Sequence, residues 1–401
     1  MRYITANFII DEQFKLLSNA LLLVQNDGTI QELLSGEKDP EKISSVDKNN
    51  IEFFEGVIVP GFVNTHCHLE LSYLKNKIQE KTGLPGFVAE VEKNKTKDSE
   101  IIRECILNAE KEMIENGIVA VGDISNTNYS LKQKQKENLY YHTFVECYAS
   151  NKKYADKAFK HATKTVEEFS KLSSDRNRAS ITPHAPYSVS KELFEKLNHW
   201  IKKNNAIVSI HNQESEDENS MFNDGSGKLA KFIQSFGTDA KDFVIGKNSA
   251  HSYVNNIPKD QHLQLVHNTY SVADDIQTIN NYFTDSYWCF CPNANLYIEN
   301  KLPQLNLFTK ENCKITIGTD SLASNHQLSV LEELKSIQKI YPDTKLTELV
   351  QWATWNGAEF LQIEETYGSF KKGKRPGIVL IENVDLENRT LTETSAAKVL
   401  A

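Results

Sequence analysis

From residue 57 onward, short apolar runs alternate with longer amphipathic stretches. This alternation predicts β-strands that are each followed by a helix, as in 156–172 and 190–204. Repeated strand–helix units are typical of a parallel sheet, and eight of them predict an α/β fold closed into a (β/α)₈ TIM barrel. The eight predicted strands are 57–68 (VIVPGFVNTHCH), 118–125 (IVAVGDIS), 140–148 (YYHTFVECY), 179–187 (ASITPHAPY), 206–214 (AIVSIHNQE), 263–270 (LQLVHNTY), 287–295 (YWCFCPNAN) and 314–322 (KITIGTDSL).

The two ends of the chain have a different pattern, with short strand-like runs and turns. Near the N-terminus, Asn-Asp-Gly-Thr at 26–29 separates two apolar runs and indicates a hairpin. The C-terminal segment again contains strand-like pieces and no long helical pattern. We therefore predict a small β-sandwich domain formed by both termini, residues 1–56 plus 365–401, beside a barrel of residues 57–364.

Composition narrows the class of protein. The formal net charge is −9, from 45 basic and 54 acidic residues without a basic block, which argues against a nucleic-acid partner. No apolar run approaches the ~20 residues of a membrane span, and the N-terminus lacks the pattern of a signal peptide. The six cysteines are thinly spread, which favours reduced thiols over a disulfide framework. The composition thus predicts a soluble, cytoplasmic protein.

Titratable side chains close five of the eight predicted strands, where apolar residues would be expected to continue. In a barrel these carboxyl ends face the active site, so the side chains converge on one mouth. Imidazole and carboxylate groups together indicate a metal site, and imidazole suits zinc. The residues are His66, His68, His184, His211, Glu214, His267 and Asp320.

The His-x-His pair follows from strand geometry. Residues two apart project from the same face of a strand, so His66 and His68 can bind one ion while Cys67 points away. His211 can provide a third ligand, and Asp320 can complete the shell and accept a proton from water. A metal bound there would lower the pKa of its water toward neutrality.

His251 and Glu70 are two further candidates for the site. His251 also lies between the fifth and seventh strands, but His267 ends the clearer strand, and we prefer it. His68 and Glu70 spell the His-x-Glu of the cytidine-deaminase zinc fold, which also requires Pro-Cys-x-x-Cys. Cys289 and Cys291 instead form Cys-x-Cys far downstream in an apolar strand, where core packing explains them better. Glu70 is therefore interpreted as a pocket or loop-capping residue. Four other histidines are interpreted as core or surface residues: His142, His161, His199 and His262.

With these residues in place, the chain resembles the amidohydrolase superfamily. Within it, the chain is similar to the metal-dependent aminohydrolases of the guanine, S-adenosylhomocysteine and aminofutalosine deaminase group. The matching segments cover nearly the whole predicted barrel, and the resemblance extends to a small β-domain built from both termini. The segments are PGFVNTHCHLE, TPHAPYSVS, IHNQES, LVHNTY, CPNANLYI, GTDSLASN and ATWNGAEFL.

The resemblance implies one divalent ion, zinc or alternatively iron, held by four ligands. It also implies that Glu214 shuttles a proton, that His267 orients the water or the substrate, and that His184 contacts the substrate. Two-metal relatives carry a lysine at the end of the fourth strand, and its absence here implies a single metal. Many relatives are dimers, which implies a homodimer. The implied metal ligands are His66, His68, His211 and Asp320.

The implied reaction is hydrolytic deamination of an amino-substituted heteroaromatic ring, such as a purine or a purine nucleoside derivative. The alternative is hydrolysis of another C–N or C–Cl bond by the same site, as in imidazolone ring opening or triazine dechlorination. A non-catalytic barrel is disfavoured because every expected ligand is present. The acidic stretch within 215–258 is expected to form an extended loop over the mouth.

Overall fold

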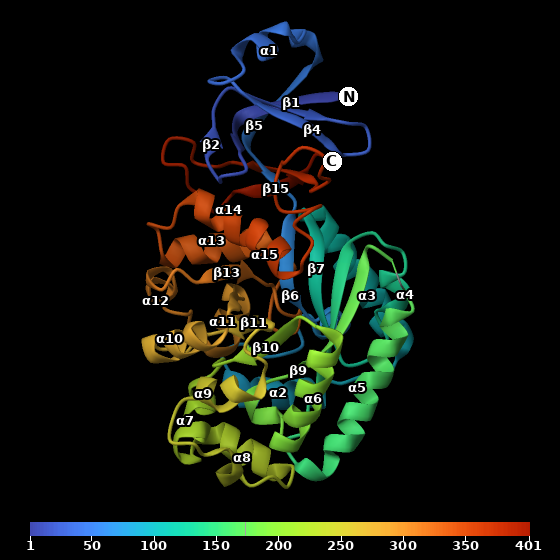
Figure 1. The fold of residues 1–401 in the computed structure, drawn as a ribbon, viewed down its shortest axis with the longest axis vertical. Coiled ribbons are helices and arrows are strands. Elements are labelled where there is room, and N and C mark those ends of the chain that lie inside the picture. Colours follow the sequence, from blue (N-terminus) through green and yellow to red (C-terminus); the bar gives the residue numbers. More distant parts are fainter. Residues whose placement is uncertain (173) are drawn as a thin grey trace. The chain divides into compact units, whose positions relative to one another are not determined.

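The structure is a computed structural model that describes residues 1–172 and 174–401, and its elements are labelled in Figure 1. The chain divides into two compact units. The predicted boundaries after residues 56 and 364 stay a prediction. The first unit comprises Met1–Asn64, Lys111–Ala120 and Ser329–Ala401, and the second comprises Thr65–Glu110 and Val121–Leu328.

The two ends of the chain share one sheet in the first unit. β5 pairs in parallel with β1, in a register that places Glu52 opposite Ile4, and antiparallel with β14, where Pro60 lies opposite Ile378. The sheet order is β15-β14-β5-β1-β3-β4, with β2 paired to β1. The pairing of the two ends within one sheet is therefore observed, whereas a sandwich is not. The strands are β1 (Arg2–Ile10), β2 (Leu16–Leu17), β3 (Ala20–Val24), β4 (Ile30–Ser35), β5 (Ile51–Pro60), β14 (Ile378–Glu382) and β15 (Ala396–Val399).

The predicted first barrel strand, residues 57–68, is interrupted at Gly61, so that it belongs to two separate strands in the structure. β5 ends at Pro60, and β6 (Phe62–Cys67) begins one residue later. The Gly61 N–H donates to the carbonyl of Pro376 at 3.1 Å. A Cβ at position 61 would lie 2.4 Å from Val119 Cγ1 and 2.6 Å from the Pro376 carbonyl oxygen. Only glycine allows this close approach of backbones. A hydrophobic pattern cannot show the break, since both halves are apolar.

The other strands form two four-stranded sheets, ordered β6-β7-β8-β9 and β10-β11-β12-β13. The pairs β8–β9, β10–β11, β11–β12 and β12–β13 are parallel, as the strand–helix alternation predicts. Parallel pairing aligns the carboxyl ends of neighbouring strands. The strands are β7 (Ile118–Ser125), β8 (Tyr140–Cys147), β9 (Asn177–Pro183), β10 (Val208–Asn212), β11 (His262–His267), β12 (Asp285–Phe290) and β13 (Lys314–Ile317).

Hydrogen bonds also join the edges of these two sheets. Between β9 and β10, the Ser209 N–H donates to Thr182 Oγ1 at 2.9 Å. Beyond β13, the N–H groups of Thr319 and Asp320 donate to the His66 carbonyl at 3.0 and 3.1 Å, and Cys67 forms a parallel bridge with Asp320. Edge contacts on both sides are consistent with a barrel.

Amphipathic stretches form helices where the pattern predicts them. α6 (Lys191–Asn204) buries Leu193, Phe194, Leu197 and Ile201, which recur at helical spacing. Ser190 Oγ caps its first turn by accepting from the Leu193 N–H at 3.4 Å. The other helices are α1 (Pro40–Ser45), α2 (Gly83–Lys93), α3 (Ser99–Glu115), α4 (Leu131–Lys134), α5 (Ala155–Ser170), α7 (Glu216–Asp224), α8 (Gly227–Ser235), α9 (Ala250–Tyr253), α10 (Ala273–Tyr282), α11 (Pro292–Glu299), α12 (Leu305–Lys310), α13 (Val330–Ile340), α14 (Leu346–Ala353) and α15 (Trp355–Phe360).

The expectation of an extended loop within 215–258 is wrong, because much of this stretch is helical. Ser215 Oγ accepts from the Glu218 N–H at 3.2 Å and caps α7, which ends at Gly225 in the left-handed region. Met221 and Leu229 belong to a buried apolar cluster that also contains Leu84 of α2. Acidic residues in the first turn obscured the helical period, although they favour a helix N-terminus.

Burial agrees with the predicted state of the cysteines. All six are free thiols, and Cys67, Cys289 and Cys291 are fully buried. Cys289 and Cys291 lie in a core cluster with Val266 and Ala294, so the core-packing interpretation is confirmed. None of the helices in the described part of the chain combines the length and apolar character that a bilayer crossing requires.

Lys134 is fully buried and provides a test of the second unit's stability. Its Nζ lies 2.5 Å from Asp123 Oδ2 and donates to Thr143 Oγ1 at 2.8 Å. Lys134→Met leaves the Asp123 carboxylate buried without its cation, so we expect unfolding in urea to require about 3 kcal/mol less free energy. The control is Lys132→Met, an exposed position on the same helix. Equal stability of the two variants would contradict the expected role of the pair.

Candidate metal centre

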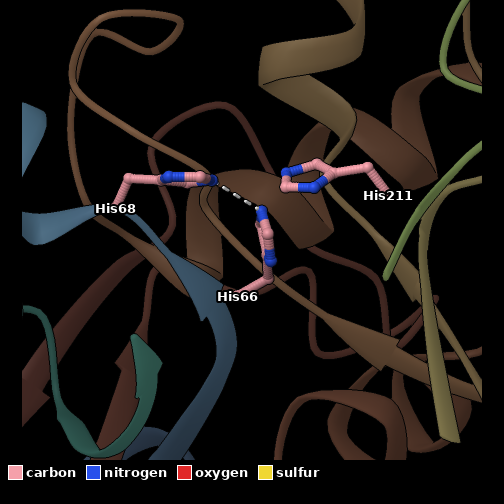
Figure 2. Close-up of side chains that lie close together, drawn as sticks. All are labelled: His66, His68 and His211. Atoms are coloured by element: carbon pink, nitrogen blue, oxygen red, sulfur yellow. Dashed lines mark hydrogen bonds between the residues drawn. The ribbon is translucent and has the colours of Figure 1, made fainter. Parts of the chain in front are cut away.

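Three histidines converge at the carboxyl ends of β6 and β10. One ring nitrogen from each lies within 4.8 Å of the other two, and the Nε2 atoms of His66 and His68 are 3.1 Å apart. Figure 2 shows the three rings pointing toward a common centre, with His211 facing the other two. His66 lies in β6 itself, and His68 follows it at the start of the short 3-10 helix η2 (Leu69–Leu74). The strand thus presents both rings on one side, as the His-x-His spacing predicts.

Asp320 completes this group from the loop that follows β13. Its Oδ1 lies 3.3 Å from His68 Nε2 and 3.7 Å from His66 Nε2, and its Oδ2 accepts from Ser324 Oγ at 2.5 Å. The backbone of Asp320 is left-handed, with φ of 54°, a conformation that aspartate tolerates better than most residues. Burial by itself raises the pKa of Asp320, but the neighbouring imidazoles of His66, His68 and His267 hold it below its usual value. The carboxylate is therefore ionised.

The protonation states suit a divalent cation. Burial lowers the pKa of His68 to about 4, and it lowers those of His66 and His211 as well. Neutral imidazoles are the form that binds metal ions. Three such rings and one ionised carboxylate, all buried, form the nitrogen-rich donor set that zinc prefers. The residues present therefore fit a metal ion of this kind.

Glu214 and His267 form a second pair beside this cluster. Glu214 Oε1 lies 3.7 Å from His267 Nε2, and the His267 ring stacks on His211 with centroids 5.5 Å apart. His267 Nδ1 is 2.8 Å from Asn295 Oδ1, so Nδ1 carries the proton and Nε2 faces Glu214. Burial raises the pKa of Glu214 well above its ordinary value, and the charge of Asp320 raises it further. Burial therefore favours the protonated form of Glu214.

His184 lies next to the cluster, directly after β9. Its ring centroid is 4.8 Å from that of His211, and its Nδ1 lies 2.6 Å from Ser188 Oγ. Its carbonyl accepts from His211 Nδ1 at 2.8 Å and from the His211 backbone N–H at 2.9 Å. Because Nδ1 of His211 is the donor, Nε2 is left to face the cluster. All seven residues predicted from strand ends thus lie together.

His251 and Glu70, the two other candidates, do not join the histidine cluster. His251 is on α9, and its Nε2 lies 3.1 Å from Asp275 Oδ1. Glu70 Oε1 accepts from the Asn126 N–H at 2.8 Å, and its Oε2 accepts from the Thr127 N–H at 3.1 Å. Glu70 is therefore a loop-capping residue, one of the two roles left open for it.

Sequence reasoning missed Glu146 at the end of β8. Its side chain is buried, and Oε1 lies 3.4 Å from His211 Nδ1. Burial raises its pKa to about 8, and the charges of Glu70 and Asp320 act in the same direction. The signal was present in the sequence, since a glutamate near the end of an apolar strand matches the pattern at the other strand ends.

Comparison with known proteins gives consistent matches. The sequence pattern of the amidohydrolase family matches residues 57–399. The chain is 28% identical to the aminodeoxyfutalosine deaminase of Nitratiruptor over 358 residues, 88% of this chain and 84% of the relative. The fold matches the crystal structure of Helicobacter pylori aminofutalosine deaminase bound to methylthio-coformycin, with a TM-score of 0.81, 24% identity, and 98% and 94% of the two chains covered. It also matches a zinc-bound adenosine deaminase from Xanthomonas campestris, with a TM-score of 0.73, 18% identity, and 99% and 90% covered.

Proposed function

The chain belongs to the amidohydrolase family, and from this premise we propose that it releases ammonia by hydrolysis from an amino-substituted purine ring, in a nucleoside-type substrate. The observation that carries the proposal is the convergence of the histidine cluster and Asp320 with the Glu214–His267 pair. A donor set for a metal ion and a buried proton donor beside it are the two components that hydrolytic deamination requires. The names of the relatives support the substrate class.

We propose that one divalent ion, zinc or alternatively iron, is held by four residues. An ion in this position supplies a water acidic enough to form hydroxide near neutral pH. Zinc is supported by the donor set and by the zinc-bound X. campestris relative. The proposed ligands are His66, His68, His211 and Asp320.

The remaining roles follow from protonation and geometry. Asp320 is ionised and can accept the proton that the attacking water loses. Burial favours the protonated form of Glu214, which can deliver its proton to the ring nitrogen next to the carbon that bears the amino group. The Nδ1 contact to Asn295 fixes the His267 ring, so the lone pair on its Nε2 can accept a hydrogen bond from the attacking water and orient it. His184 is proposed to contact the substrate. The ring carbon gains oxygen from water, and its bond to nitrogen breaks as the amino group takes up the proton held by Asp320 and leaves as ammonia. The proton of the added hydroxyl group then returns to Glu214.

We also propose that the two four-stranded sheets close into one (β/α)₈ barrel. The support comes from the hydrogen bonds between β9 and β10 and from the bridge between Cys67 and Asp320. Closure would bring all the strand ends named above to one face. The shared sheet of β1–β5, β14 and β15 supports a composite β-domain of residues 1–56 and 365–401.

Product release from a panel of compounds tests this function. Purified protein loaded with Zn²⁺ is expected to release ammonia from adenosine, 5′-deoxyadenosine or aminodeoxyfutalosine, and to leave a chlorotriazine intact. Chloride release without ammonia release would contradict deamination and support hydrolysis of a C–Cl bond. That alternative is considered because the fold is similar to that of an atrazine chlorohydrolase. Protein that retains less than about a tenth of an equivalent of metal after purification and reloading would contradict the metal centre.

A further inference from the structure

A chain of buried polar contacts connects Glu70 with His211. Glu70 accepts hydrogen bonds from the backbone N–H groups of Asn126 and Thr127. The Asn126 side chain in turn donates from Nδ2 to Glu146 Oε2 at 3.1 Å. The other oxygen of Glu146 lies 3.4 Å from His211 Nδ1. The chain thus runs from the residue two positions after His68 to the ring of His211.

Glu146 is a buried carboxyl group, and one of its two oxygens has no hydrogen bond among the described residues. Its side chain is 3% exposed, and its Oε1 has no hydrogen-bond partner of ordinary length among the described residues. A buried carboxyl group costs free energy unless its oxygens are satisfied. His211 Nδ1 lies 3.4 Å from Oε1, and it also lies 2.8 Å from the His184 carbonyl, to which it donates. The two oxygens therefore lie on the same edge of the His211 ring.

That edge determines which nitrogen of His211 can bind a cation. A hydrogen held on Nδ1 leaves the lone pair on Nε2, which is directed at the cluster. Carboxylate groups that accept from the outer nitrogen of a metal-binding histidine fix its orientation and increase its basicity. In its ionised form, which a cation held by the cluster would favour, Glu146 is placed to provide this contact. Asn126 and Glu70 fix Glu146 relative to the segment that carries His68.

We infer that Glu146 is a positioning residue, which with Asn126 and Glu70 braces His211 against the His66–His68 segment and pre-forms the metal centre. This role depends on the proposed metal centre, because the three residues would hold the ligands of that centre in place. Glu146, His184 and His211 also lie close enough to suggest a second cation site. That reading is disfavoured because His211 Nδ1 already carries the hydrogen donated to the His184 carbonyl.

Metal affinity of the metal-free protein tests the brace directly. In Glu146→Gln, the amide keeps the size of the side chain, and its oxygen can still accept from Asn126, so an NH₂ group faces the His211 N–H. Two donors then oppose each other, and we expect Co²⁺, titrated against a competing chelator, to bind about 10–100-fold more weakly than in the parent protein. The visible absorption of bound Co²⁺ should also change, whereas the melting temperature of the metal-free protein should not.

Glu110→Gln is the matched control. Glu110 is 1% exposed, and its carboxylate accepts from Tyr141 Oη and from Asn138 Nδ2, at 2.9 Å each. Within the described part of the chain Glu110 makes no contact with the histidine cluster, so its substitution should leave Co²⁺ affinity unchanged. A second variant, Asn126→Ala, removes the Nδ2 contact from a half-buried position and should weaken Co²⁺ binding in the same direction.

The outcomes separate the brace from other roles. Co²⁺ affinity within about twofold of the parent in both Glu146→Gln and Asn126→Ala would overturn it. A rise in KM for substrate at unchanged Co²⁺ affinity would also overturn it and assign Glu146 to the substrate. Because Co²⁺ binding requires no substrate, failure of the brace can be told apart from failure of the proposed deamination.

Discussion

Replacing His211 with alanine is expected to abolish metal binding and ammonia release together. His211 lies between the two parts of the site, since one of its ring nitrogens lies within 4.8 Å of one from each of His66 and His68 and its ring stacks on His267. Without it, the cluster loses one of three imidazoles, and the water near the reacting carbon returns toward its ordinary acidity. We expect the rate of ammonia release to fall by about 10⁴-fold, with metal content measured by atomic absorption falling in parallel.

His142→Ala is the matched control for this substitution. His142 and His211 are equally buried, each 6% exposed, but His142 Nε2 contacts Ser180 Oγ at 3.0 Å rather than the cluster. The control variant is expected to lose stability and to keep its metal and activity. If His211→Ala retained a full equivalent of metal, the ligand assignment would be wrong.

Glu214→Gln is expected to separate proton transfer from metal binding. The amide occupies the same volume but cannot donate and regain a proton as a carboxyl group does. Glu214 also has no part in the three-histidine cluster. We therefore expect kcat for ammonia release to fall by about 10³-fold, within the range for loss of a general acid–base group, while metal content stays at the parent level.

Glu216→Gln, two residues further along, is the control for this experiment. Glu216 is exposed at the start of α7, so its substitution should leave kcat unchanged. A Glu214→Gln variant with its metal and near-full turnover would refute the shuttle role. Loss of metal from the same variant would instead indicate that Glu214 supports the cluster.

The strand-end residues were predictable because their signal is local. The spacing of His66 and His68 requires only the two-residue period of a strand, and a titratable residue at the end of an apolar run stands out without knowledge of its neighbours. The helix at 191–204 was predictable for the same reason, since its buried residues recur at helical spacing. The break at Gly61 was not predictable, because the backbone that approaches it belongs to residue 376.

The roles of glutamates could not be decided from the sequence either. Glu70 and Glu146 each occupy positions that a motif could assign to catalysis. Their partners are backbone groups at 126–127 and a ring nitrogen at 211, which are distant in sequence. Burial raises the pKa of Glu214 above its ordinary value, whereas the neighbouring imidazoles of His66, His68 and His267 hold the pKa of Asp320 below its ordinary value despite burial. Which carboxyl group keeps a proton depends on these neighbours.

The sequence by itself therefore determined the α/β class, the strand ends that carry chemistry, and the identity of the metal-binding candidates. These depend on periodicity and residue type, which are properties of short segments. Only the tertiary structure decided that His267 rather than His251 joins the cluster, that Glu70 caps a loop, and that Glu146 faces His211. Those outcomes depend on which strands pair and on what each side chain meets when it is buried, and both are set by contacts between residues far apart in the chain.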